Sequence, residues 1–209
     1  MNICNIIEQR LKEFEELGNK GFTTFEFFPF LNLKINATIQ TELAFCISTA
    51  NSSALSGLRF QKSLENLNLE SLSVKDFENL LKSAGVRFWS RKAEYIYEAL
   101  RRFEVIEKAL KLESRLAREY LVRNIRGIGY KEASHFLRNV GRKDVAIIDR
   151  HILRWLHEND YLREIPKSLS TKSYKKIENT LEKIAKKRRI SLAELDLILW
   201  FQKTGKILK

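Results

Sequence analysis

The order of apolar and polar residues along the chain predicts a protein built almost entirely from helices. Apolar side chains recur every three or four positions in residues 6–17, 39–59 and 131–140, and again after Ser191. A long, highly charged stretch at 95–120 is also typical of helix. Eight glycines and two prolines in 209 residues are few, which favours helices joined by short connections. The pattern therefore predicts an all-α fold.

Three details of this pattern concern the first half of the chain. The helix at 6–17 is expected to end near Gly18. Residues 22–33 contain five phenylalanines and one proline, which predicts a connector whose rings pack in the core; a stacking platform for nucleic-acid bases is the alternative. Residues 64–80 are expected to form two short helices, and Ser73 is a plausible N-cap for the second.

The most informative stretch is residues 121–157, whose pattern is that of helix, tight hairpin, helix, loop and helix. Gly127 and Gly129 lie in the hairpin, where glycine permits positive φ at little steric cost. The amides of such a hairpin, beside the N-terminus of the helix at 131–140, form a site for an anion such as a DNA phosphate. Gly141 stands where that helix is expected to end.

Two ionisable residues in this stretch are candidates for chemistry. Lys131 falls in the first turn of the second helix, where the positive end of the helix dipole disfavours an ammonium. Partial burial would lower its pKa as well and make the amine a usable nucleophile. Asp149 follows the apolar run 145–148 and stands at an N-cap position. Facing each other across a cleft, the two would form an acid/base pair; a surface lysine and an ordinary helix cap are the alternative.

An excess of basic residues indicates a polyanionic partner. The chain has 38 Lys and Arg against 26 Asp and Glu, a net charge of +12. Nucleic acid is the commonest partner of such a chain, although a ribosomal or membrane-surface protein would also fit. Five cations gather within residues 182–190, namely Lys183, Lys186, Lys187, Arg188 and Arg189. A solvated helix face and contacts to phosphates both account for this cluster.

The cysteines and the hydropathy exclude several classes of protein. Cys4 and Cys46 are the only cysteines, so they cannot form a four-cysteine iron–sulfur cluster, and no zinc-ligand spacing is present. The sequence therefore indicates no metal and no other cofactor. No apolar run of about 18 residues occurs, and the N-terminus lacks the plan of a signal peptide. We expect a protein of the cytoplasm, associated with the nucleoid of a prokaryote.

The letters GIGYK, followed by an apolar run and Asp-Arg-His, resemble the motif of the helix-hairpin-helix DNA glycosylase superfamily. In that superfamily a lysine attacks the sugar C1′ to form a Schiff base, and a downstream aspartate assists. The resemblance implies these roles for Lys131 and Asp149. It also implies that Gly127 and Gly129 bind a DNA phosphate, and that Arg150 or His151 adds a second phosphate contact.

Two segments earlier in the chain extend this resemblance. The small polar run after the helix at residue 39 matches a helix end that fills the space left by a flipped nucleotide, which implies that role for Asn51; an ordinary turn residue is the alternative. Residues 84–96 resemble the superfamily's glycine, aromatic and Lys-Ala-x-x-Ile segment. Gly85 would end one helix and Ser90 would cap the next. Phe88 in this loop is a candidate for base stacking.

The end of the chain resembles a narrower group, the compact archaeal-type 8-oxoguanine DNA glycosylase/AP lyases. In that group the chain stops at a lysine near the base pocket, and an aromatic residue nine positions earlier lies against the base. Trp200 and Lys209 match this spacing. The resemblance implies that Phe88 and Trp200 sandwich the base, while the carboxylate or a carbonyl near Lys209 accepts the N7–H of 8-oxoguanine. A frayed terminus is the alternative for Lys209.

These observations predict an all-α protein of two helical subdomains with a cleft between them. Residues 40–142 would form one subdomain, including the helix-hairpin-helix at about 121–140, and residues 1–39 with 143–209 would form the other. The expected function is excision of 8-oxoguanine from double-stranded DNA through a lysine Schiff base, followed by strand cleavage by β-elimination. A glycosylase for another oxidised base and a non-catalytic DNA-binding module remain alternatives. We expect a monomer without a membrane partner.

Overall fold

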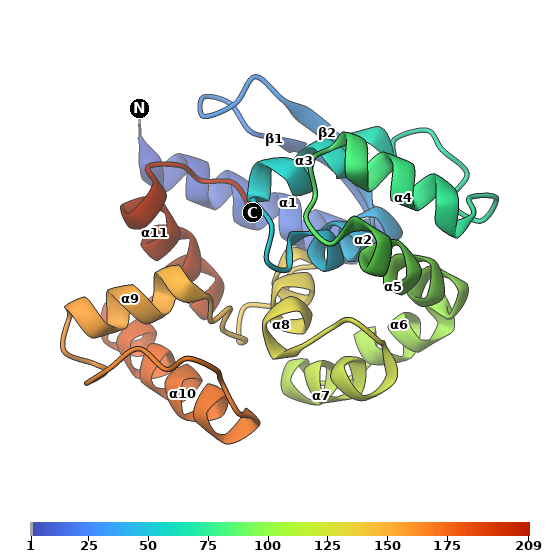
Figure 1. The fold of residues 1–209 in the computed structure, drawn as a ribbon. Coiled ribbons are helices and arrows are strands. Elements are labelled where there is room, and N and C mark those ends of the chain that lie inside the picture. Colours follow the sequence, from blue (N-terminus) through green and yellow to red (C-terminus); the bar gives the residue numbers. More distant parts are fainter. Residues whose placement is uncertain (1) are drawn as a thin grey trace.

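The computed structural model describes residues 2–209, and this part of the chain forms eleven helices and one two-stranded hairpin (Figure 1). The elements are α1 (Ile3–Lys20), β1 (Phe22–Glu26), β2 (Lys34–Thr38), α2 (Ile39–Thr49), α3 (Ala54–Ser63), α4 (Val74–Ser83), α5 (Trp89–Arg101), α6 (Phe103–Leu110), α7 (Ser114–Asn124), α8 (Tyr130–Asn139), α9 (Arg150–Glu158), α10 (Thr171–Arg188) and α11 (Leu192–Thr204). The predicted all-α class is confirmed, with the hairpin as a small addition.

The phenylalanine-rich segment 22–33 forms strand β1 and the turn that leads to β2, rather than only a connector. β1 and β2 pair antiparallel, with Phe25 opposite Ile35. Phe25 and Phe27 are fully buried, as expected for core packing, whereas Phe22 and Phe28 are exposed. Because alternate side chains of a strand point to opposite faces, only half of the aromatic rings in such a segment can reach the core.

The first helix is longer than its sequence pattern indicates. α1 continues through Gly18 to Lys20, and Gly21 ends it with φ of 82°. Gly18 lies against the end of α8, where an added Cβ would be only 2.1 Å from the carbonyl oxygen of Val140. This glycine therefore allows two helices to approach closely and does not end its own helix.

Two other helical predictions also need correction. Only one helix, α4, occurs within residues 64–80, and the hydroxyl of Ser73 caps it as expected. The charged stretch 95–120 is divided among α5, α6 and α7. Arg102 breaks the first of these helices with φ of −115° and ψ of 39°, and residues 111–113 separate the other two.

The buried apolar residues form two clusters. The larger contains residues from α1 to α8 and from the hairpin, together with Val145, Leu197, Ile207 and Leu208; the smaller is formed chiefly by α9, α10 and α11. The described part of residues 1–39 therefore packs in the larger cluster, although the sequence-based division grouped this segment with residues 143–209. Because α1 also contacts α11, that division into subdomains stays a prediction. Figure 1 shows α9, α10 and α11 to one side of the remaining helices.

Candidate functional site

A cavity of about 680 Å³ lies where these two groups of helices meet. Its walls come from the α2–α3 loop and α8 on one side and from α9 and α11 on the other. Seven of the ten residues predicted for the site line it: Asn51, Lys131, Asp149, Arg150, His151, Trp200 and Lys209. Gly127, Gly129 and Phe88 do not.

The hairpin before α8 requires glycine at position 127 but not at position 129. Gly127 has φ of 86°, and a Cβ at this position would be 2.1 Å from the ring of Tyr95, so only glycine fits. Gly129 has φ of −95° and ψ of −176°, which any residue can adopt, so the expected positive φ is wrong here. Gly129 is the N-cap of α8, and its N–H donates to the Glu132 carboxylate at 3.3 Å.

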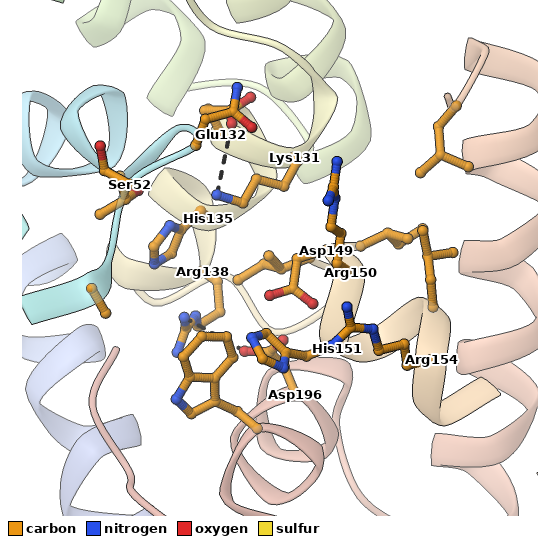
Figure 2. Close-up of a pocket in the computed structure, with 18 of the residues that line it drawn as sticks. Ser52, Lys131, Glu132, His135, Arg138, Asp149, Arg150, His151, Arg154 and Asp196 are labelled. Carbon is orange, nitrogen blue, oxygen red and sulfur yellow. Dashed lines mark ion pairs between the residues drawn. The ribbon is translucent and has the colours of Figure 1, made fainter. Parts of the chain in front are cut away.

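The amine of Lys131 enters the cavity from α8. Lys131 is the second residue of this helix, and about a quarter of its side chain is exposed (26%). Its Nζ lies 3.7 Å from Oε1 of Glu132, and Figure 2 shows the amine on the side of the cavity where Ser52 lies. A terminal amine in a partly enclosed cavity can reach a ligand there.

A carboxylate reaches the same cavity from α9. Asp149 is the N-cap of this helix, as expected, and accepts the N–H of Ile152 at 2.9 Å. Figure 2 shows its carboxylate facing the cavity into which Lys131 also projects. The loop between α8 and α9 thus brings together two groups that the sequence separates by 18 positions.

A second carboxylate lies deeper on the same wall. Asp196 of α11 is 3.5 Å from the guanidinium of Arg138 on α8. Burial raises the pKa of Asp196 to about 6; the cation of Arg138 opposes this shift and the carboxylate of Asp149 adds to it. The two acids therefore differ: Asp196 is enclosed beside an arginine, whereas Asp149 caps a helix at the cavity.

The side chain of Lys209 points away from the cavity. Its ammonium donates to Glu42 at 2.6 Å and to Gln61 at 2.5 Å, and it lies 4.0 Å and 4.4 Å from the ring centres of Phe25 and Phe45. Burial lowers the pKa of this ammonium to about 8. Since the side chain is fully buried and the whole residue is 6% exposed, the atoms that Lys209 presents to the cavity belong to its main chain.

Comparison with known proteins identifies the family. A family model described as 8-oxoguanine DNA glycosylase matches residues 7–190. The chain belongs to the 8-oxoguanine DNA glycosylase family. It is 48% identical to an 8-oxoguanine DNA glycosylase/AP lyase of Methanocaldococcus jannaschii, over 99% of this chain and 93% of the relative. It is 43% identical to the Aquifex aeolicus protein of the same name, over 97% and 92%.

Solved structures of glycosylases of this family have the same fold. The crystal structure of the Methanocaldococcus jannaschii 8-oxoguanine glycosylase/lyase in complex with a 15mer DNA containing 8-oxoguanine matches with a TM-score of 0.85 at 44% identity, over 100% of this chain and 94% of that one. The Thermotoga maritima 8-oxoguanine DNA glycosylase matches with a TM-score of 0.86 at 36% identity, over 99% and 92%. The predicted family is confirmed.

Phe88 lies outside the cavity. It is the N-cap of α5, with φ of 57°, and it is 60% exposed with the Arg87 guanidinium 5.3 Å from its ring centre. It therefore does not face Trp200 across the cavity, as the expected sandwich requires. The cap expected at Ser90 is also wrong, because Ser90 lies inside the helix and its hydroxyl donates to Glu78.

His135 is a residue of the cavity that the sequence analysis missed. It is buried, and within residues 2–209 neither ring nitrogen makes a hydrogen bond to another side chain, while the main chain of Lys209 lies beside the ring. Burial lowers its pKa well below the ordinary value, so the ring is neutral and offers one donor and one acceptor. The indole nitrogen of Trp200 is likewise buried and finds no partner in the described chain. The sequence did offer a signal for His135: it lies four positions after Lys131 and therefore on the same face of the helix.

Two further properties of the described chain concern metal ions and membranes. Among residues 2–209, no three His, Cys, Asp or Glu side chains come close enough together to hold a metal ion. Within the same range, no helix is both long enough and apolar enough to cross a membrane.

Proposed function

We propose that this protein excises 8-oxoguanine from duplex DNA and then cleaves the strand at the resulting site. The observation that carries the proposal is that Lys131 and Asp149 line one cavity, as an amine nucleophile and a carboxylate must. The names of the relatives support the choice of substrate. The protein would act on chromosomal DNA.

The duplex would be held around the cavity mouth. The hairpin amides at Gly127 and Gly129 would bind a phosphate of the damaged strand, and that phosphate would replace the Gly129–Glu132 contact. Arg150 and His151 would bind a neighbouring phosphate. Asn51 would enter the stack where the nucleotide has left and offset part of the few kcal/mol that flipping costs.

The flipped base would be recognised by its donors and acceptors. 8-Oxoguanine has an N7–H donor where guanine has an acceptor, so discrimination needs a fixed acceptor. The main chain of Lys209 and the neutral ring of His135 each offer one at the cavity, while the indole of Trp200 supplies an aromatic face. Guanine would leave such an acceptor unpaired, which penalises its binding.

The chemistry would proceed through a covalent intermediate. The neutral amine of Lys131 attacks C1′, the bond from C1′ to N9 breaks, and the base departs with the bonding electrons and takes up a proton. Asp149 accepts a proton from the attacking amine and stabilises positive charge on the sugar. The C1′–O4′ bond then breaks, O4′ takes up a proton and the nitrogen lone pair forms the protonated imine of the open sugar. This imine makes the C2′ proton acidic, so loss of that proton expels the 3′ phosphate and cleaves the strand.

Borohydride trapping tests this proposal, because it reduces the imine to a permanent bond between protein and DNA. We expect the wild type to be trapped on 8-oxoguanine duplex and Lys131→Gln to bind the duplex without trapping or nicking. Lys167→Gln, which removes another lysine of the same cavity, should still be trapped. Strand cleavage by Lys131→Gln would contradict the assignment. Trapping on thymine glycol but not on 8-oxoguanine would favour another oxidised base, and binding without base release would favour a non-catalytic module.

A further inference from the structure

The ammonium of Lys92 lies where the α2–α3 loop meets the loop that precedes α5. Lys92 is in the first turn of α5 and is 5% exposed. Its Nζ donates to the carbonyl oxygen of Ser48 at 2.7 Å and to the hydroxyl oxygen of Ser52 at 3.0 Å. The Ser48 carbonyl belongs to the last turn of α2, where carbonyls lack partners within the helix. A cation placed there satisfies the carbonyl and complements the helix dipole.

Ser52 extends this connection to a second loop. Its hydroxyl oxygen also accepts the main-chain N–H of Arg87 at 2.8 Å. Lys92 and Ser52 thus tie the α2–α3 loop to the loop that precedes α5. Each of these loops contains a non-glycine residue in the left-handed region, Asn51 with φ of 53° and Phe88 with φ of 57°. Such conformations persist only where the surroundings fix them.

The side chains of Asn51 and Phe88 are both exposed, and that of Asn51 also lines the cavity of the proposed reaction. Asn51 and Ser52 line the cavity, and Figure 2 shows the amine of Lys131 on the side of Ser52. Lys92 itself does not line the cavity. Its pKa falls to about 8, first because it is buried and second because the ammonium of Lys131 is close. The tie between the loops is therefore adjacent to the chemistry without touching a substrate.

We propose that Lys92 is a positioning residue for nucleotide flipping, which holds the loops of Asn51 and Phe88 together so that both side chains meet the DNA as one rigid unit. The inference rests on the proposed function, because it presupposes that a nucleotide leaves the duplex. Without the ammonium, the Ser48 carbonyl loses its partner and the two strained residues can relax independently. The chemistry at Lys131 would remain, but delivery of the base to the cavity would slow.

The test compares two duplexes that differ in the cost of flipping. In one, 8-oxoguanine pairs with cytosine; in the other, it faces an abasic analogue and has no partner base. Lys92→Met keeps the length of the side chain and removes the ammonium. We expect its single-turnover excision to fall by about tenfold or more on the paired lesion and by less than about threefold on the unpaired one. The fluorescence of 2-aminopurine beside the lesion should show less unstacking.

Two further variants control this experiment. Arg142→Met removes a comparable bond, from a guanidinium to the Leu110 carbonyl at the end of α6, away from the cavity; neither substrate should be affected. Ser52→Ala breaks the same tie with a smaller change, so it carries the test if Lys92→Met does not fold. Equal losses on both duplexes, or undiminished excision of the paired lesion, would overturn the role of Lys92. A wild type that releases no 8-oxoguanine would instead refute the proposed function.

Discussion

Asp149 has a structural role and a proposed catalytic role, and different substitutions can separate the two. Its carboxylate caps α9 and also faces the cavity of the proposed reaction. Asparagine caps a helix as well as aspartate does, so Asp149→Asn should keep the stability of the fold and lose base release. Asp149→Ala should lose base release and also about 1 kcal/mol of stability. Urea unfolding and single-turnover excision measure the two effects.

A second N-cap provides the control for Asp149. Ser73→Ala removes the cap of α4, which does not line the cavity. This variant should lose a similar amount of stability, about 1 kcal/mol, and keep its activity. Undiminished excision by Asp149→Asn would leave this residue with only a structural role.

The sequence could predict the positions of those site residues that are set by their neighbours in the chain. Lys131 and Asp149 each follow a recognisable helix-start pattern, and the structure places both where the pattern indicates. The partners of Lys209 could not be found in this way. Glu42 and Gln61 lie 167 and 148 positions earlier, and only the folded chain shows that they enclose an ammonium. The orientation of the Lys209 side chain, away from the cavity, follows from these distant partners.

At the scale of elements, the glycines of the hairpin before α8 allow backbone strain to be distinguished from a steric clash of an added Cβ. Gly127→Ala would place a Cβ 2.1 Å from Tyr95 in addition to forcing a left-handed alanine. Gly21→Ala has the same backbone problem, with φ of 82° and nothing within 4 Å of the added atom, and should cost only about 1–2 kcal/mol. We expect Gly127→Ala to cost more and also to weaken binding to lesion duplex, since the hairpin must shift.

The third glycine completes the series. In Gly129→Ala the added Cβ would meet only the flexible end of Glu132, at 3.1 Å, and the backbone is extended. Its stability and DNA binding should stay near those of the wild type, as measured by urea unfolding and by titration with labelled duplex. Equal effects of alanine at positions 127 and 129 would contradict the different roles of the two glycines.

The elements that the sequence did not reveal are those defined by distant partners. The recurrence of apolar residues at helical spacing locates α2, α8 and α11 in the sequence, although the folded chain buries α2 on every side from Thr41 to Thr49. β1 and β2 require the pairing of Phe25 with Ile35 across a turn, and the run of aromatic residues between them hides the alternation. Gly18 likewise has the appearance of a helix end until the approach of Val140 explains it.

For the whole molecule, Lys209 predicts a dependence of stability on pH. Its pKa is about 8 in the fold and 10.5 as its ordinary value. Between these values the unfolded chain carries a proton that the folded chain has released, so stability rises with pH across this window. The free energy of unfolding of the wild type relative to Lys209→Met should therefore increase from about pH 8 to pH 10.5. Urea unfolding across the window measures the difference; a constant value would contradict the buried ammonium.

A buried ion pair connects the helices of the two apolar clusters. The guanidinium of Arg118 on α7 donates to Oε2 of Glu178 on α10 at 2.7 Å, and Oε1 of Glu178 accepts the N–H of Ala146 at 2.9 Å. Tyr130 and Tyr174, whose ring centres lie 5.2 Å and 5.4 Å from the guanidinium, enclose the pair. Because the cavity lies between the same two groups of helices, we expect this pair to contribute to the distance between its walls.

Arg118→Met would leave the Glu178 carboxylate buried without its cation, which should cost about 3–5 kcal/mol and lower excision. Adding Glu178→Gln removes the stranded charge and keeps an acceptor for Ala146, so the double variant should regain much of the stability. Its excision should stay low if the pair aligns the walls. Arg10→Met breaks the pair with Glu13 inside α1, away from the cavity. If the two single variants lose the same stability, Arg10→Met should excise the base faster than Arg118→Met. Equal excision rates would mean that the Arg118–Glu178 pair stabilises the fold without aligning the cavity walls.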